Sequence, residues 1–242
     1  QGFTTRAVHA GRQDFIERGV HAPPLDLSTT YPTPDLDQSA RSFDRLVSGD
    51  SPEAGAFVYQ RLFNPTTDRF EQALAELEGA EDAAAFGSGM AAFTATLLAA
   101  KSRGSHVVSV RPLYGTADHL LTSGLLGFEV TWTTQDEVAR AIRPDTALVV
   151  IETPGNPTLA LVDIAHVVRQ AGRVPVLVDS TFATPVLQRP LEHGAALVMH
   201  SATKFIGGHG TAIGGVIAAS GRFHWNNGNV PGMTEPSPGY HG

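Results

Sequence analysis

From residue 63 onward, short apolar segments alternate with helical segments, and this alternation limits the fold more than any other feature of the chain. The seven apolar segments span residues 83–87, 106–110, 128–132, 147–151, 175–179, 196–200 and 214–219. Apolar strands that are separated by helices are typical of a mostly parallel sheet with helices on both faces. The pattern therefore predicts a three-layer α/β domain built on a mostly parallel, seven-stranded sheet.

The sequence divides into three predicted parts. Residues 1–62 contain several prolines and a polar stretch, and they show little periodicity beyond a short helix at 39–47. We expect them to form an extended arm that has little core of its own. We assign residues 63–219 to the sheet domain and residues 220–242 to a segment that leads away from it.

The predicted sheet domain begins with a helix that has clear boundary signals. Asn64 is a candidate N-cap, and Pro65 follows at the first helical position, where its missing N–H is harmless. Gly79 is expected to end the helix. Between them, one face of the helix is apolar, with Phe70, Ala73, Leu74 and Leu77.

The composition narrows the possible classes of protein. Of the 242 residues, 42% are hydrophobic and 17% are charged, as in ordinary globular proteins. The net charge of −7 argues against a nucleic-acid-binding protein, and no apolar run approaches the ~20 residues that a membrane span needs. Cysteine is absent, which excludes disulfides, and the first residues lack the apolar core of a signal peptide. We therefore expect a cytoplasmic protein that binds neither nucleic acid nor membrane.

The loops after the strands contain the candidate functional residues, because ligands of such sheets bind where the strands end. In FGSGMAAF, the backbone N–H groups of Gly89 and Met90 lie at the start of a predicted helix, where they would bind an anion. Ser201 and Thr203 follow a later strand and could donate two hydroxyl protons to the same phosphate. A tight turn without a ligand and a simply capped strand end are the alternatives.

Lys204 and Asp179 are the candidate reactive residues. Lys204, one of only two lysines, follows the apolar strand that ends at His200. Burying an ammonium costs several kcal/mol unless it is paired or neutral, so a lysine in such a place favours a nucleophilic amine. Asp179 ends another apolar strand, and its carboxylate needs a partner, either an arginine or a protonated ring nitrogen of a ligand. An ordinary surface lysine and a structural ion pair are the alternatives.

Three aromatic or basic side chains complete the candidates. Tyr59 and Arg61 stand two residues apart in a segment that we expect to be extended, so both would face the same way and could bind a phosphate; surface packing of the arm is the alternative. Tyr114 follows a strand and would stack on a planar ligand or stand at the rim of the site. The spacing of His200 and His209 matches no standard ligand pattern, so we expect no metal site.

Together these residues match the requirements of pyridoxal 5'-phosphate. This cofactor needs a lysine for its aldehyde, an acidic partner for its ring nitrogen and fixed donors for its phosphate. Lys204 would bind the aldehyde and then move protons between substrate carbons. Asp179 would keep the ring nitrogen protonated, which lets the ring accept electrons.

Six segments in a fixed order resemble a known family: YQRLFNPTTDRFEQALAELEG, FGSGMAA, PLYGT, ETPGNPTL, VDSTFATPVLQRPLEHGA and HSATKFIGGHG. From about Thr4 to its end, the chain resembles the Cys/Met-metabolism family of pyridoxal-phosphate enzymes, the trans-sulfuration group. The resemblance implies the aspartate-aminotransferase type of fold, known as PLP fold type I. It also implies a small-molecule amino-acid substrate and a homotetramer made of catalytic dimers, in which the arm of residues 1–62 contacts a neighbouring subunit.

The resemblance further implies roles for the candidate residues. It makes Lys204 the residue that forms a Schiff base with the cofactor and Asp179 the partner of the ring nitrogen. Tyr114 would stack over the ring and assist proton transfer, and Asn156 would lie near the ring hydroxyl. The implied phosphate ligands are Gly89, Met90, Ser201 and Thr203, together with Tyr59 and Arg61, which reach the phosphate of the neighbouring subunit.

The chain departs from the family in three respects. Ser180 stands where the family often has asparagine, and Ala196 stands where an acidic residue is usual. Neither change affects the residues named above, so we expect the cofactor still to bind. The smaller C-terminal domain of the family, which supplies the arginine that binds the substrate carboxylate, is not present in this chain.

The expected reaction is γ-replacement on an O-acyl-homoserine, of the sulfhydrylase or cystathionine γ-synthase type. The tail GRFHWNNGNVPGMTEPSPGYHG resembles the O-acetylhomoserine sulfhydrylase branch, whereas YGTADHLLTSGLLG resembles cystathionine-type synthases and lyases. The alternative is a C–S lyase of the cystathionine or methionine γ-lyase type. Thr116 argues against methionine γ-lyase, because those enzymes usually carry a cysteine at this position. A non-catalytic binding or scaffold protein is the alternative of another class.

Overall fold

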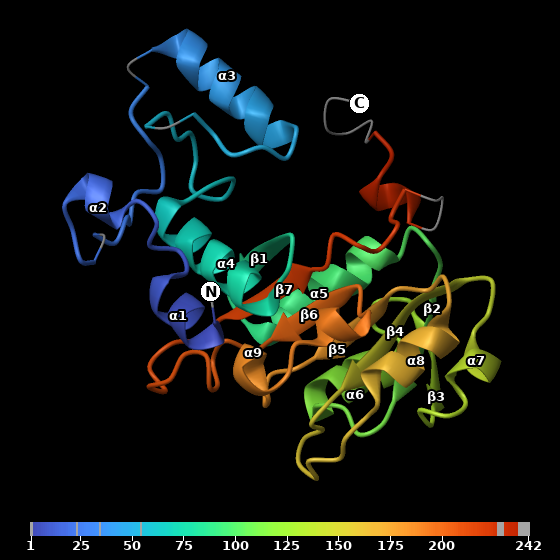
Figure 1. The fold of residues 1–242 in the computed structure, drawn as a ribbon. Coiled ribbons are helices and arrows are strands. Elements are labelled where there is room, and N and C mark those ends of the chain that lie inside the picture. Colours follow the sequence, from blue (N-terminus) through green and yellow to red (C-terminus); the bar gives the residue numbers. More distant parts are fainter. Residues whose placement is uncertain (1, 23, 34, 54, 227–229, 237–242) are drawn as a thin grey trace. The chain divides into compact units, whose positions relative to one another are not determined.

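The computed structural model describes residues 2–22, 24–33, 35–53, 55–226 and 230–236 (Figure 1). Its contacts divide the chain into two compact units, Gln1–Ala73 and Leu74–Gly242, and each unit is described by itself. Helix α4 (Pro65–Glu78) runs across the division. The predicted partition into an arm, a sheet domain and a terminal segment stays a prediction.

The first unit contains more helix than the sequence indicates. Helices α1 (Phe3–His9) and α2 (Phe15–Arg18) lie in a region that the sequence predicts as irregular. They are too short to produce a recognisable apolar period, and α2 is tied to the start of α4 by a contact that is remote in sequence. Nη2 of Arg69 lies 2.7 Å from Oδ2 of Asp14, the residue before α2. Long-range contacts of this kind leave no trace in local sequence.

Helix α3 (Leu36–Val47) confirms the short predicted helix but starts at Leu36 rather than at residue 39. The cause is Asp35, whose side chain accepts a hydrogen bond of 2.9 Å from the backbone N–H of Asp37 and so caps the helix.

Helix α4 begins and ends where the sequence predicts. Oδ1 of Asn64 accepts hydrogen bonds from the backbone N–H groups of Thr66 and Thr67, at 2.9 and 3.1 Å, which is the geometry of an N-cap. At the other end, Gly79 has a φ of +66°, in the left-handed region that terminates helices.

The second unit contains a seven-stranded sheet with the strand order β1-β7-β6-β5-β4-β2-β3. The strands are β1 (Asp82–Phe86), β2 (His106–Val110), β3 (Glu129–Thr133), β4 (Thr146–Glu152), β5 (Val176–Asp179), β6 (Leu197–His200) and β7 (Gly215–Ala219). Strands β3, β2, β4, β5 and β6 pair in parallel, and β7 is antiparallel to both of its neighbours. This confirms the predicted mostly parallel sheet of an α/β fold.

The reversed direction of β7 has a consequence for β1. Because β7 is antiparallel to both β6 and β1, β1 runs in the same direction as the parallel strands. The carboxyl ends of β1, β2, β4, β5 and β6 therefore meet at one edge of the sheet, although their sequence positions extend from Phe86 to His200.

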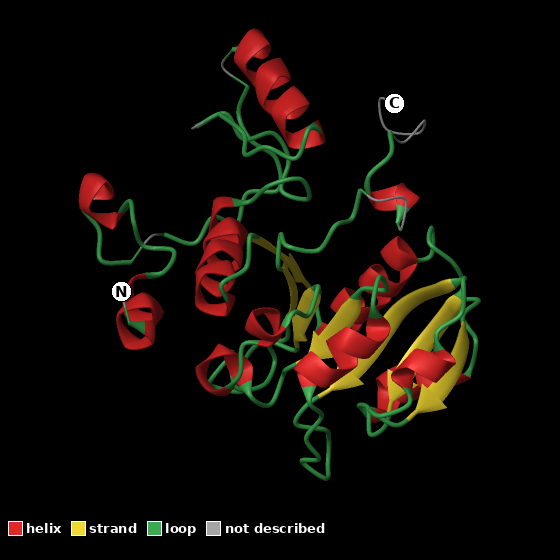
Figure 2. Ribbon diagram, turned by 45° about the vertical axis from the view of Figure 1, so that its right-hand side comes forward, coloured by secondary structure: helices red, strands yellow, loops and turns green. Residues whose placement is uncertain are grey.

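Helices cover both faces of the sheet (Figures 1 and 2). Helix α5 (Gly89–Ala100) and helix α6 (Gly115–Thr122) share one apolar core with alternate strand residues, among them Val107, Leu148 and Leu177. The next residue of each strand points to the other face, and Val108, Val149 and Val178 are fully buried there. Helix α8 (Ile164–Ala171) packs against β5 and buries its apolar side.

The remaining helices are short. They are α7 (Val138–Ala141), α9 (Thr184–Leu187) and the two 3₁₀ helices η1 (Pro190–His193) and η2 (Pro231–Met233). Within the described part of the chain, none of the helices combines the length and apolar character that crossing a bilayer requires.

Candidate functional site

A cavity of about 240 Å³ lies at the edge of the sheet where the strand carboxyl ends meet. Eight predicted site residues line it: Gly89, Met90, Tyr114, Asn156, Asp179, Ser201, Thr203 and Lys204. Ser88, Glu152, Thr181 and Phe182 also contribute, although the sequence analysis assigned them no role. The sheet topology thus brings together side chains from five separate loops, as the alternation of strands and helices predicts.

The glycine turn after β1 approaches the loop after β6 very closely. A methyl group added at Gly89 would lie only 2.8 Å from Cβ of Ser201, so only glycine fits at this position. Ser88 caps α5, since its Oγ accepts a hydrogen bond of 3.0 Å from the backbone N–H of Ala91. The first N–H groups of a 12-residue helix therefore lie beside Ser201 at the cavity wall, an arrangement that favours an anion.

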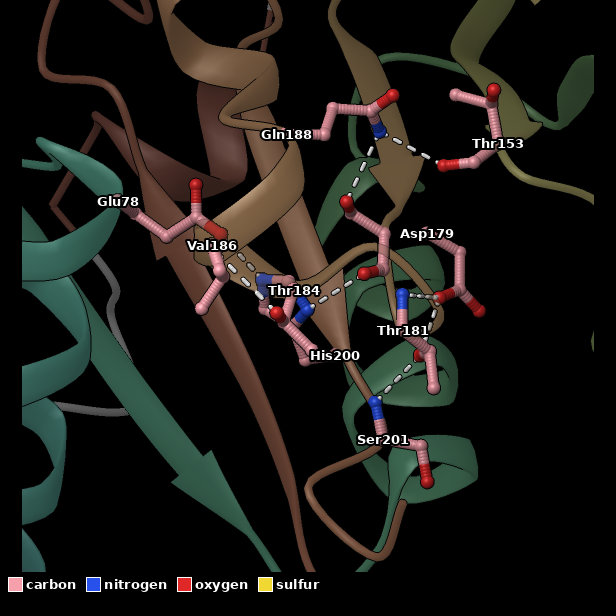
Figure 3. A network of polar contacts seen from close by, with 10 residues as sticks. Glu78, Thr153, Asp179, Thr181, Thr184, Val186, Gln188, His200 and Ser201 are labelled. Carbon is pink, nitrogen blue, oxygen red and sulfur yellow. Dashed lines mark hydrogen bonds and ion pairs between the residues drawn. The ribbon is translucent and has the colours of Figure 1, made fainter. Parts of the chain in front are cut away.

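Asp179 is only 9% exposed and presents one unused oxygen. Its Oδ1 accepts hydrogen bonds from the backbone N–H and from Oγ1 of Thr181, at 3.0 and 2.6 Å (Figure 3). Burial raises the pKa of Asp179 above its ordinary value, and the Thr181 hydrogen bonds and the charge of His200 offset only part of this increase. Among the described residues, Oδ2 has no hydrogen-bond or ion-pair partner, so the predicted alternative of a structural pair with arginine is wrong.

Thr181 joins two loops of the site. Its hydroxyl donates to Asp179 and accepts a hydrogen bond of 2.8 Å from the backbone N–H of Ser201 (Figure 3). One side chain therefore fixes both the carboxylate after β5 and the serine after β6. The two-residue spacing of Asp179 and Thr181 is typical of a turn in which a carboxylate accepts a hydrogen bond from the second residue after it. This spacing is the sequence signal that indicates the contact between Thr181 and Asp179.

Glu152 is the second buried carboxylate of the site. It ends β4 directly opposite Asp179 in the parallel pairing with β5, and it is 6% exposed. It accepts hydrogen bonds from the backbone N–H of Tyr114 and, at 2.9 Å, from that of Asn156. Burial and then the charge of Asp179 raise the pKa of Glu152 to about 7. Glu152 therefore holds in place the two loops that present Tyr114 and Asn156.

Lys204 lies at the cavity, but the argument that led to it is wrong. The side chain is exposed, because Lys204 stands in the loop beyond the end of β6 rather than in the strand itself. No hydrogen bond or ion pair of the ammonium occurs among the residues that the structure describes, so Lys204 is available to a ligand.

Thr203 and Tyr114 line the cavity in different ways. The Thr203 hydroxyl lies 3.2 Å from the carbonyl oxygen of Gly214, to which it donates, and accepts from the Gly214 N–H at 3.1 Å, so it closes its own loop. Its proton is thus not directed to the cavity, unlike the free donor that the sequence predicts. Tyr114 precedes α6, and its side chain is 42% exposed at the cavity.

Tyr59 and Arg61 belong to the first unit, whereas all residues that line the cavity belong to the second. The prediction of an extended segment is wrong at Arg61, because residues 60–62 form a turn in which the N–H of Leu62 donates to the carbonyl of Tyr59. The two side chains are nevertheless adjacent, with the Arg61 guanidinium 5.4 Å from the centre of the Tyr59 ring.

The described residues contain no group of three or more His, Cys, Asp or Glu side chains that could hold a metal ion. His200, which the sequence analysis weighed as a metal ligand, is fully buried and hydrogen-bonded instead to Glu78 and to the backbone of Ser180.

Comparison with known proteins identifies the family. Residues 4–232 match the model of the Cys/Met metabolism PLP-dependent enzymes. The chain is 57% identical to the L-methionine gamma-lyase of Streptomyces avermitilis over 92% of its own length and 54% of that protein. It is 40% identical to the O-acetyl-L-homoserine sulfhydrylase of Leptospira meyeri over 98% of its length and 54% of that protein. The chain therefore spans about half the length of these relatives.

Solved structures agree in fold. The chain superposes on metB from Corynebacterium glutamicum with a TM-score of 0.78 and 34% identity, covering 91% of this chain and 55% of the other. It superposes equally well, at 32% identity, on cystathionine gamma synthase from Xanthomonas oryzae pv. oryzae. Both comparisons support the predicted PLP fold type I.

The relatives favour the lyase alternative over the γ-replacement that the sequence analysis expected. The 57% identity to methionine gamma-lyases exceeds the 40% identity to the sulfhydrylase. Thr116, which argues against methionine γ-lyase in the sequence, is exposed and, unlike Tyr114 and Ala117, does not line the cavity. From the match over residues 4–232 and the shared fold, the chain belongs to the Cys/Met-metabolism family of PLP-dependent enzymes.

Proposed function

We propose that this chain forms the cofactor-binding part of a C–S lyase that removes the γ-substituent of methionine with the help of pyridoxal phosphate. The 57% identity to proteins named L-methionine gamma-lyase carries this proposal. The overall reaction consumes one water and converts methionine to methanethiol, ammonia and α-ketobutyrate. The cavity that Lys204, Asp179 and Tyr114 share supports the same assignment.

The residues of the cavity fit pyridoxal phosphate. The backbone N–H groups at Gly89 and Met90 and the hydroxyl of Ser201 would hold the phosphate, with Thr203 supporting its loop. The unpartnered Oδ2 of Asp179 would accept a hydrogen bond from the protonated ring nitrogen. Tyr114 would stack over the ring, and Asn156 would lie near its hydroxyl. Lys204 would bind the aldehyde, and Tyr59 and Arg61 would reach the phosphate of a neighbouring subunit.

Each side chain then has a defined task. When bound, the cofactor supplies a sink for the electrons left at the substrate α-carbon. The Lys204 amine would remove the α-proton of the substrate and return protons to the substrate carbons. Tyr114 donates a proton to the departing thiolate. Glu152 keeps Tyr114 in place through its backbone N–H.

A second candidate is γ-replacement, in which sulfide displaces acetate from O-acetylhomoserine. The 40% identity to the sulfhydrylase of Leptospira meyeri supports it. Both candidates require the same cofactor residues and differ in whether a thiol enters or water completes the reaction.

Product analysis of the purified protein with pyridoxal phosphate distinguishes them. Methionine alone is expected to yield methanethiol and α-ketobutyrate in equal amounts. Homocysteine from O-acetylhomoserine and sulfide, without keto acid from methionine, would instead establish the γ-replacement candidate. A protein that takes up no cofactor and stays colourless would support the scaffold alternative.

The two lysines of the chain provide a matched control. Borohydride reduction followed by peptide mapping is expected to place the cofactor on Lys204 and not on Lys101. Lys204→Ala should abolish both the yellow colour and the turnover, whereas Lys101→Ala should retain them. Labelling of Lys101 in the wild-type protein would contradict the assignment.

A further inference from the structure

Glu78 and His200 form a buried pair that no step of the proposed reaction uses. Glu78 is the last residue of α4, and His200 is the last residue of β6. Both side chains are 0% exposed, and Nε2 of His200 lies 2.6 Å from Oε1 of Glu78 (Figure 3). Neither lines the cavity, but His200 directly precedes Ser201, and its ring reaches the loop of Asp179.

The hydrogen bonds of His200 determine where its protons lie. Nδ1 is 3.1 Å from the carbonyl oxygen of Ser180, which can only accept, so Nδ1 carries a proton. An ionised carboxylate can also only accept. The 2.6 Å contact therefore needs a further proton between Glu78 and Nε2. The pair holds this proton either as imidazolium with carboxylate or as imidazole with carboxylic acid.

The pair is linked through Ser180 to three residues that line the cavity, Asp179, Thr181 and Ser201. The carbonyl of Ser180, which accepts from His200, also accepts from the N–H of Thr184 at 2.9 Å. On one side of Ser180 stands Asp179, and on the other Thr181, which binds Ser201 through its hydroxyl. A shift of the His200 ring would therefore move the carboxylate after β5 and the serine after β6 together.

We propose that Glu78 holds His200 as an imidazolium, and that this buried pair positions Asp179 and keeps it ionised for a positively charged ring nitrogen. The inference rests on the proposed pyridoxal-phosphate function. Asp179 needs such support because it is nearly enclosed and Thr181 satisfies only one of its oxygens. A cation at the residue next to Ser201 of the cavity wall offsets part of the cost of that buried charge. Glu78 and His200 are thus positioning residues.

The first test uses protein without cofactor. In nitrogen-labelled histidine spectra at pH 7, identified by comparison with His200→Gln, both ring nitrogens of His200 are expected to be protonated. A wild-type Nε2 without a proton would overturn the inference. This measurement is independent of catalysis and cofactor, so it tests the pair even if the proposed function fails.

The second test measures cofactor affinity in Glu78→Gln, which can still form a hydrogen bond to Nε2 but leaves the ring neutral. Pyridoxal phosphate should bind roughly tenfold more weakly to this variant than to wild type. An analogue with carbon in place of the ring nitrogen should bind equally to both, because it places no charge opposite Asp179. Equal weakening of both ligands would show a merely structural role and overturn the inference.

Two controls complete the design. Glu76→Gln removes a carboxylate from the same helix, and it should leave both affinities unchanged. A wild-type protein that binds neither ligand would refute the proposed function, whereas normal binding with a neutral His200 would refute only this inference.

Discussion

Two carboxylates at the ends of neighbouring strands dominate the electrostatics of the site. Glu152 and Asp179 stand opposite each other in the parallel pairing of β4 and β5, and both are nearly enclosed. Their surroundings differ, because Glu152 accepts from two backbone N–H groups on separate loops, whereas Thr181 is the sole donor to Asp179 among the residues that the structure describes. Glu152 thus holds two loops of the site in place, whereas the carboxylate of Asp179 is available to a ligand.

The raised pKa of Glu152 predicts a pH dependence of stability. Between its ordinary value of 4.5 and about 7, the native carboxyl keeps a proton that the unfolded chain has lost. The free energy of unfolding should therefore fall as pH rises through this interval, by about 3 kcal/mol, and level off above it. In Glu152→Gln this component should be absent.

Urea unfolding of cofactor-free protein at several pH values measures this pH-dependent part of the free energy of unfolding. The difference between wild type and Glu152→Gln isolates the contribution of the Glu152 carboxyl. A difference that does not change between pH 4.5 and 7 would contradict the assignment of the titration to Glu152.

Single residues were predictable from sequence only in part. Lys204 and Asp179 follow apolar runs, so their places at the strand ends could be read directly, but the exposure of Lys204 could not. Glu152 occupies an equally conspicuous position, yet its partners are backbone N–H groups, which no residue type reveals. The turn at Arg61 directly follows Tyr59, which pairs with Thr30, and a contact so remote in sequence leaves no local signal.

At the scale of elements, the two N-caps of the first unit provide a matched comparison. Asn64 is 5% exposed, and besides capping α4 it donates to the carbonyl of Asp26 and to the hydroxyl of Tyr31. Asp35, which caps α3, is exposed. Asn64→Ala should lower the free energy of unfolding by about 2 to 4 kcal/mol, because buried partners lose their hydrogen bonds, and Asp35→Ala by only about 1 kcal/mol.

The free energies of unfolding of the two variants are compared by chemical denaturation, monitored by far-ultraviolet circular dichroism. Asn64→Asp, which keeps the acceptor but loses the donors, should fall between them. Equal costs for the two alanine substitutions would show that the extra contacts of Asn64 contribute nothing.

The elements were predictable in proportion to their local signals. All seven strands lie within one or two residues of the predicted segments, since buried apolar runs with loop residues on either side mark them. The start of α4 was also clear, because Asn64 and Pro65 signal it locally. The strand order and the reversed β7 depend on pairing between distant segments, so no local pattern contained them.

For the whole molecule, the proposed role of the first unit is to complete the site of a neighbouring subunit. Arg61→Ala and Lys204→Ala should each be inactive alone. If Arg61 acts across the interface, co-expression of the two variants should restore about a quarter of wild-type turnover, because half of the mixed dimers' sites are intact.

The measurement is methionine turnover of co-expressed subunits against each variant purified alone. The control is a protein in which every subunit carries both substitutions, and it should stay inactive. No recovery in the mixture would mean that Arg61 serves its own subunit or none.

The position of β7 in the sheet also bears on synthesis of the protein. It hydrogen-bonds to both β1 and β6, and it is the last strand of the described chain to be made. Until it leaves the ribosome, β1 lacks the strand that joins it to the sheet, so the glycine turn near residue 89 is less firmly held against the serine at 201. A nascent chain that lacks β7 is therefore expected to be unable to capture the cofactor, however complete its other strands are.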